Sequence, residues 1–130
     1  MTKEERIARC RELKKSVNCA QAVALGFADV VGVDEDVLAR CTQAYGGGMG
    51  TMDGTCGTIV GAGMIIGLVS ADRPSARKTM AEVMTRFKER NGATVCRVLK
   101  GVDTGCPLRA CPDCVADSAE ILYDALHIDD

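Results

Sequence analysis

Residues 56–71 read CGTIVGAGMIIGLVSA, and this stretch decides the fold class. A helix over these residues would be apolar on every side, which predicts a position at the centre of a helical bundle. Two pairs of its glycines are spaced four residues apart, so neighbouring helices could approach it closely. Asp72, Arg73 and Pro74 follow it and predict its end.

Amphipathic helices are expected on both sides of this central segment. Before it, Thr2, Asn18 and Asp34 are N-cap candidates for helices over residues 3–15, over residues 19–31, and from residue 35 to the glycines at 46–48. After it, residues 75–91, 93–100 and 112–127 continue the helical pattern. No stretch alternates like a strand. We predict one all-α, cysteine-rich domain over residues 1–130, a bundle of about six to seven helices around the central glycine-containing helix.

The composition excludes several classes of protein. The chain is 47% hydrophobic and 26% charged, which is typical of a folded globular domain. Basic and acidic residues are interspersed with a net charge of −2, which argues against nucleic-acid binding. The longest apolar run, residues 57–71, is short for a membrane span, and the N-terminal residues lack an apolar signal region. We expect a cytoplasmic protein without a membrane span.

Eight cysteines are unusual for a chain of 130 residues. In the cytoplasm they indicate redox chemistry, metal binding or simple core packing. Cys19, Cys56 and Cys111 each fall at the start of a predicted helix, where unpaired amide groups and the helix dipole favour a thiolate. Cys96 lies on a short predicted helix, where the neighbouring Arg97 could stabilise a thiolate.

Two other cysteines, Cys10 and Cys41, occupy regular positions on the apolar faces of predicted helices. Packing in the core explains such positions without any chemistry. The single histidine, His127, lies near the end of the last predicted helix and is interpreted as a surface residue. One histidine gives little support to a base–nucleophile pair and excludes a zinc site with several histidines.

A glycine-rich loop precedes Cys56. Gly47, Gly48, Gly50 and Gly57 would let backbone or another molecule approach the sulfur closely, so they are the candidate cofactor-binding residues. The loop lacks the Gly-Lys-Ser/Thr ending of a phosphate-binding loop and does not follow a predicted strand. Nucleotide binding is therefore not predicted.

The sequence CPDC at residues 111–114 would place two sulfurs near each other at the start of the last helix. This arrangement is typical of a dithiol/disulfide couple. It is also half of a zinc site, and Cys106 extends it to the spacing found in plant-type ferredoxins. Cys114 could alternatively be a small buried hydrophobic residue.

Several motifs occur in one order: NCAQAV at 18–23, GGGMG at 46–50, CGTIVGA at 56–62, CRVL at 96–99, CPDCV at 111–115 and AEIL at 119–122. This order resembles the prokaryotic C_GCAxxG_C_C family of redox-active proteins, over roughly residues 16–126. The resemblance places the four family cysteines at Cys19, Cys56, Cys96 and Cys111, with Thr58 where the motif has alanine. Some members carry selenocysteine, which fits redox chemistry. The remaining cysteines, Cys114 included, lie outside the family pattern.

Three functions follow as hypotheses. In the first, Cys19, Cys56, Cys96 and Cys111 converge beside the glycine loop for thiol–disulfide exchange or electron transfer, with Cys56 as nucleophile and Cys114 able to pair with Cys111. In the second, the same four cysteines bind zinc or an iron–sulfur cluster. In the third, the protein is a non-catalytic binding module. The redox partner is not identified, and the glycine-lined helices would suit a homodimer.

Overall fold

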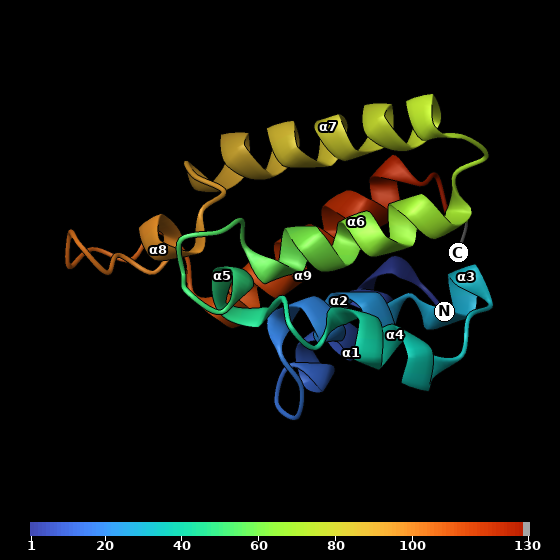
Figure 1. Cartoon of the computed structure of the whole chain (residues 1–130), viewed down its shortest axis with the longest axis horizontal. Helices are drawn as coiled ribbons and strands as arrows, with labels where there is room; N and C mark the ends of the chain where they lie inside the picture. Colours follow the sequence, from blue (N-terminus) through green and yellow to red (C-terminus); the bar gives the residue numbers. More distant parts are fainter. Residues whose placement is uncertain (129–130) are drawn as a thin grey trace.

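A computed structural model describes residues 1–128 as a bundle of helices (Figure 1). The helices are α1 (Lys3–Leu13), α2 (Cys19–Gly26), α3 (Ala28–Val31), α4 (Glu35–Thr42), α5 (Gly46–Met49), α6 (Gly57–Val69), α7 (Arg73–Asn91), α8 (Cys96–Leu99) and α9 (Cys111–Ala125). Within these residues the only β pairing is an isolated bridge between Thr55 and Val95. The predicted all-α class is confirmed.

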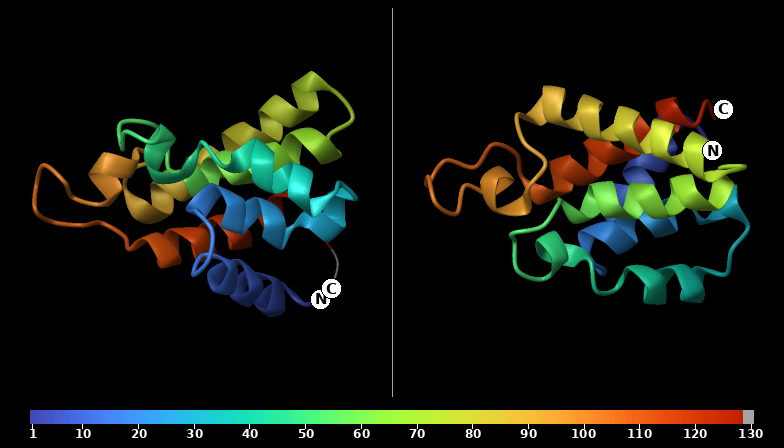
Figure 2. Two further views of the ribbon diagram at one scale, coloured as in Figure 1. Left: turned by 60° about the horizontal axis from the view of Figure 1, so that its bottom comes forward. Right: turned by 45° about the horizontal axis from the view of Figure 1, so that its top comes forward.

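Helix α6 lies at the centre of the bundle, in contact with α2, α7 and α9 (Figures 1 and 2). Gly61 permits the contact with α2, because a Cβ there would lie 3.1 Å from the carbonyl carbon of Ala20 and still closer to its oxygen. The prediction of a central helix is confirmed, with one difference. Leu68 and Val69, at its end, are 46% and 39% exposed, so the last turn of α6 leaves the core.

The predicted N-caps are confirmed. The side chains of Thr2, Asn18 and Asp34 accept hydrogen bonds from the backbone N–H groups of Glu5, Gln21 and Asp36. Each cap joins residues only two or three positions apart, so it could be predicted from the local sequence.

The predicted helix over residues 19–31 is interrupted at Phe27, which has φ −115° and separates α2 from α3. Arg6 of α1 explains the break. Its Nη1 donates to the carbonyl oxygen of Gly26 at 2.9 Å, and its guanidinium lies 5.0 Å from the centroid of the buried Phe27 ring. A contact from another helix therefore replaces continuous helical bonding.

The glycine-rich loop contains the short helix α5, which the sequence analysis did not predict. Gly48 has φ +60° and is buried, a conformation that glycine adopts without strain. Backbone hydrogen bonds then join this loop to the segment around α8: Cys96 N–H donates to Gly54 at 3.0 Å, and Cys56 N–H donates to Thr94 at 2.7 Å. These bonds bring Cys56 and Cys96 to the same end of the bundle.

A search of residues 1–128 finds no helix with the length and apolar character that crossing a membrane requires.

Candidate functional site

Five cysteines line one pocket at the end of the bundle where α2, α6, α8 and α9 begin. The cavity is small, about 20 Å³, which is room for about one water molecule. Its lining residues are Cys19, Gly47, Cys56, Gly57, Cys96, Leu99, Lys100, Arg109, Cys111 and Cys114. All five candidate catalytic cysteines are therefore brought together, beside the glycine loop.

Local sequence places the cysteines at helix starts. Cys19, Cys96 and Cys111 are the first residues of α2, α8 and α9, and Cys56 is the N-cap of α6. Cys114 lies one turn into α9. At the starts of α2 and α6, the backbone N–H groups of Ala20 and Thr58 donate to the sulfurs of Cys19 and Cys56.

Cys19 has the most acidic thiol of the pocket. A hydrogen bond from the Cys111 thiol, followed by backbone N–H groups of Gly47 and Ala20, lowers its pKa to about 6 against the opposing effect of burial. The glycine loop therefore donates to Cys19.

Cys56 has a different set of donors. A hydrogen bond from the Cys114 thiol, then the hydroxyl and backbone N–H of Thr58, lower its pKa to about 7 although the residue is 5% exposed. Its Sγ lies 3.1 Å from Thr58 Oγ1. Ser118 Oγ donates to that same Oγ1 at 2.7 Å, which leaves the Thr58 proton available for the sulfur.

The partner thiols are shifted in the opposite direction. The pKa of Cys111 is raised, first by its hydrogen bond to Cys19 and then by burial, and the pKa of Cys114 is raised in the same way by Cys56. The opposite shifts identify two hydrogen-bonded cysteine pairs, Cys19 with Cys111 and Cys56 with Cys114. The two cysteines of the CPDC sequence thus form hydrogen bonds with cysteines at the starts of two different helices, Cys111 with Cys19 of α2 and Cys114 with Cys56 before α6.

Cys96 completes the pocket with an ordinary buried thiol. It packs against Gly48, where a Cβ would lie 2.5 Å from the Cys96 Cβ. Burial is the main reason that its pKa is raised, and Lys100 is the cation that opposes this. The prediction that Arg97 stabilises a Cys96 thiolate is wrong, because the Arg97 guanidinium donates to Asp53 at 2.8 Å.

The four candidate glycines fall into three groups. Gly47 and Gly57 line the pocket. Gly57 is also needed for space, since a Cβ there would meet Cys19 Sγ and lie 2.7 Å from the carbonyl oxygen of Tyr45. Gly48 backs Cys96, whereas Gly50 is exposed and does not line the pocket. A cofactor-binding role for the loop stays a prediction.

The cysteines outside the pocket differ from one another. Cys10 is fully buried, as predicted. Cys41 is exposed, which corrects the prediction that it packs in the core. The inward face of α4 is formed by Leu38 and Thr42, four residues apart, and Cys41 lies beside that face. Cys106 is exposed in the segment between α8 and α9, so the ferredoxin-like spacing does not bring it to the pocket.

The candidate metal ligands, Cys19, Cys56, Cys96 and Cys111, all line the pocket. Among residues 1–128, no three side chains of cysteine, histidine, aspartate or glutamate are arranged to hold one metal ion. The sulfurs of Cys19 and Cys56 accept hydrogen bonds from Cys111 and Cys114. Cysteine thiols release their protons when they bind a metal, so the zinc or iron–sulfur hypothesis stays a prediction of the sequence.

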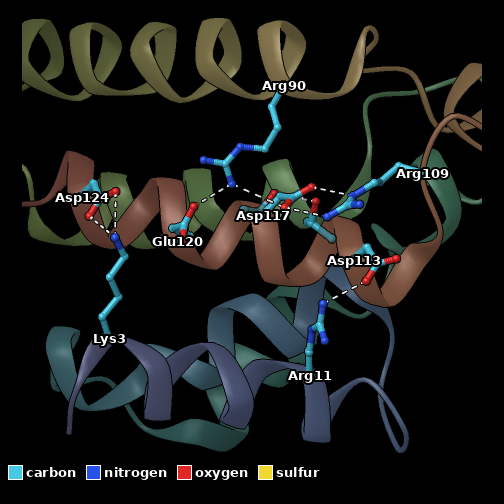
Figure 3. A network of polar contacts seen from close by, with 10 residues as sticks. Lys3, Arg11, Arg90, Arg109, Asp113, Asp117, Glu120 and Asp124 are labelled. Carbon is cyan, nitrogen blue, oxygen red and sulfur yellow. Dashed lines mark hydrogen bonds and ion pairs between the residues drawn. The ribbon is translucent and has the colours of Figure 1, made fainter.

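Helix α9 is held between α1 and α7 by ion pairs along its acidic side (Figure 3). Asp117, which is 6% exposed, accepts from Arg109 at 2.9 and 3.1 Å and lies 3.4 Å from Arg90 of α7. Asp113 pairs with Arg11 of α1 at 2.9 Å. Because Arg109 also lines the pocket, these contacts hold the segment before α9 over the sulfurs.

Sequence reasoning missed Ser118, Arg109 and Lys100 as parts of the site, and treated Thr58 only as a departure from a motif. Ser118 is separated from Thr58 by sixty positions, so no local signal connects them. A buried hydroxyl on an apolar helix face is the one clue that the sequence offered.

Comparison with known proteins agrees with this geometry. Searches of curated proteins and of solved structures gave no match. A family model described as "Putative redox-active protein (C_GCAxxG_C_C)" matches residues 17–125, which include every cysteine of the pocket. With its pocket cysteines inside a match that covers most of the chain, this protein belongs to the C_GCAxxG_C_C family.

Proposed function

We propose that this protein performs thiol–disulfide exchange with two dithiol pairs, Cys19 with Cys111 and Cys56 with Cys114. One arrangement carries the proposal: all four cysteines line one pocket, where hydrogen bonds from Cys111 and Cys114 lower the pKa of Cys19 and of Cys56. A sulfur pair in contact, with one member ionised near neutral pH, has the nucleophile and the partner that disulfide formation needs.

The chemistry balances with a disulfide as oxidant. A thiolate and a thiol of one pair form an S–S bond, and two electrons pass to an acceptor disulfide, which becomes one thiolate and one thiol. The proton of Cys111 or Cys114 moves to the acceptor. Full oxidation of both pairs transfers four electrons, two for each bond formed.

Access favours the Cys19–Cys111 pair as the one that meets the partner. Cys111 is partly exposed, whereas Cys19 is 5% exposed. In the oxidised pair an incoming thiolate attacks Cys111, and Cys19 leaves as a thiolate. A pKa of about 6 makes Cys19 a good leaving group. Cys56, predicted as the attacking thiol, belongs to the more buried pair, so in this proposal it attacks within the pocket and does not meet the external partner.

Cys96 takes no part in either bond in this proposal. It lines the same pocket, but its pKa is raised and a thiolate there is disfavoured. Replacing it with serine should leave both disulfides able to form.

The test is equilibration of the protein in dithiothreitol redox buffers, followed by alkylation and mass-spectrometric disulfide mapping. We expect two bonds, Cys19–Cys111 and Cys56–Cys114, each with its own midpoint potential. Cys41→Ser is the matched control, because this exposed cysteine lies outside the pocket. Absence of both bonds, with uniformly slow labelling of all buried thiols, would instead support the non-catalytic module.

A further inference from the structure

We infer that α9 transfers a disulfide from the Cys19–Cys111 pair to the Cys56–Cys114 pair through a transient Cys111–Cys114 bond. The inference rests on the proposed function and adds the order in which the two pairs become oxidised. The first pair is called the outer pair and the second the inner pair.

The inner pair is closed to a large partner. Cys56 is 5% exposed and Cys114 is 2% exposed. The cavity that all four sulfurs line, about 20 Å³, holds about one water molecule, so a disulfide-bearing substrate does not fit inside it. Cys111 is the only member of the two pairs that is more than marginally exposed in the described structure. Oxidation of the inner pair by a large disulfide therefore needs an internal donor.

The outer and inner pairs adjoin each other in two places. Cys111 and Cys114 are three residues apart at the start of α9, so they share one face of its first turn. On the other side of the pocket, the Cys19 sulfur packs against Gly57, the residue that follows Cys56. A thiolate on Cys19 also raises the pKa of Cys56, as expected for like charges that line one pocket. All four cysteines line the same pocket, and an exchange of disulfide partners within it is what we infer.

The first step uses the proton that the inner pair shares. The Cys56 thiolate accepts the proton of Cys114, to which it is hydrogen-bonded. The Cys114 thiolate then attacks Cys111 Sγ, the Cys111–Cys114 bond forms, the Cys19–Cys111 bond breaks, and Cys19 leaves as a thiolate. The acidity of Cys19 favours this direction of cleavage.

The second step regenerates a thiol on Cys111. Cys56 attacks Cys114 Sγ, the Cys56–Cys114 bond forms, and Cys111 leaves and takes up the proton that Cys56 releases. The result is an inner disulfide, a Cys19 thiolate and a Cys111 thiol. No external electron donor or acceptor enters, because one disulfide is exchanged for another.

The ion pairs of α9 suit this role. Arg11 holds Asp113, which lies between the two cysteines in sequence, and Arg109 and Arg90 hold Asp117 one turn further along (Figure 3). The start of α9 is therefore positioned from both sides. Exchange then depends on side-chain rotation of the cysteines and needs no movement of the helix.

The test compares two oxidants that differ in size. A pyridyl disulfide linked to dextran is too large for the pocket, whereas hydrogen peroxide is comparable to the water molecule that the cavity accommodates. Peroxide converts the Cys56 thiolate to a sulfenic acid, and Cys114 then forms the disulfide with release of water. Reduced protein is mixed with either oxidant, quenched in acid, alkylated and mapped by mass spectrometry over time.

In the wild-type protein, dextran disulfide should close the outer bond before the inner bond. In Cys111→Ser, closure of the inner bond by the dextran reagent should slow by at least roughly tenfold, while peroxide still closes it. In Cys56→Ser the final acceptor is absent, and so is the hydrogen bond that chiefly raises the pKa of Cys114, so Cys114 can ionise without Cys56 and the Cys111–Cys114 bond should become detectable. Cys41→Ser is the control and should match the wild-type rates.

An unchanged rate of inner-pair oxidation by dextran disulfide in Cys111→Ser would overturn the transfer, as would absence of the Cys111–Cys114 bond in Cys56→Ser. Neither result would affect the proposed function. That function fails on a different observation, namely that peroxide and dextran disulfide both leave the inner and outer pairs of the wild-type protein unoxidised.

Discussion

Cys10 and Cys19 are both buried cysteines, yet their surroundings shift their pKa values in opposite directions. Cys10 is fully buried where α1 crosses α2, and burial raises its pKa to about 12. Cys19 is 5% exposed, and hydrogen bonds lower its pKa to about 6. Burial alone therefore makes a cysteine inert, and donors aimed at the sulfur make it reactive.

The two sites also use glycine for different purposes. A Cβ at Gly26 would collide with the Cys10 sulfur, so glycine there makes room for a packed thiol. Gly57 makes similar room for Cys19, but Gly47 adds an N–H that donates to the same sulfur. The packed thiol of Cys10 and the pocket thiol of Cys19 therefore differ in whether hydrogen-bond donors reach the sulfur.

The largest expected effect is the difference in alkylation between Cys19 and Cys10 in the native protein at neutral pH. The pKa values of about 6 and about 12 give a thiolate ratio of about 10⁵, and the lower nucleophilicity of the more acidic thiol removes about 10²–10³ of it. Iodoacetamide should modify Cys19 about 100-fold faster or more, as measured by peptide mass spectrometry. Equal rates in the native protein would refute the comparison.

Removing the main donor of Cys19 is expected to have the next largest effect. In Cys111→Ala the pKa of Cys19 should rise by about one to two units, since its strongest hydrogen bond is lost while burial remains. The pH dependence of Cys19 alkylation measures this. Cys41→Ala, which changes an exposed thiol outside the pocket, should leave the value unchanged.

The same contrast should appear in stability. The lowered pKa of Cys19 gives stability that is present at and above pH 9, the ordinary value, and is lost as pH falls through 6. The raised pKa of Cys10 gives stability that is present below pH 9 and is lost as pH rises towards 12.

Urea unfolding at a series of pH values, with thiols kept reduced, should therefore show a maximum near pH 9. Replacing Cys19 by serine should reduce the slope below the maximum by on the order of 1 kcal/mol per pH unit. Cys10→Ala should instead flatten the slope above it. A slope below pH 9 that does not change in the Cys19 variant would contradict the role of its donors.

The smallest expected effect concerns the hydroxyl groups beside Cys56. Thr58→Ala removes one of several donors and should raise the pKa of Cys56 by about half a unit, a roughly threefold loss of thiolate at low occupancy. Ser118→Ala acts only through Thr58 and should have less effect. The pKa of Cys19, measured in the same samples, is the internal control.

Much of the cysteine site follows from local sequence. Asn18 caps α2 through Gln21, three residues away, and this places Cys19 at a helix start. The position of Cys56 before a glycine-rich apolar helix is equally local. Patterns within one or two helical turns carry this information, because capping and helical periodicity depend only on near neighbours.

Other features were outside the reach of such patterns. Cys41 has a spacing from Leu38 that suits an inward face, yet α4 turns Leu38 and Thr42 inward and leaves Cys41 exposed. The break at Phe27 depends on Arg6, which reaches it from another helix. In both cases the deciding contact comes from a part of the chain that local periodicity does not describe.

By itself, the sequence determined an all-α bundle around an apolar glycine-containing helix and placed three cysteines, Cys19, Cys56 and Cys111, at helix starts. Only the tertiary structure decided that Cys111 faces Cys19 and that Cys114 faces Cys56, and hence which thiols are acidic. The physical reason is that a helix start depends on bonds between near neighbours, whereas the ionisation of a buried sulfur depends on the donors that packing brings from distant segments.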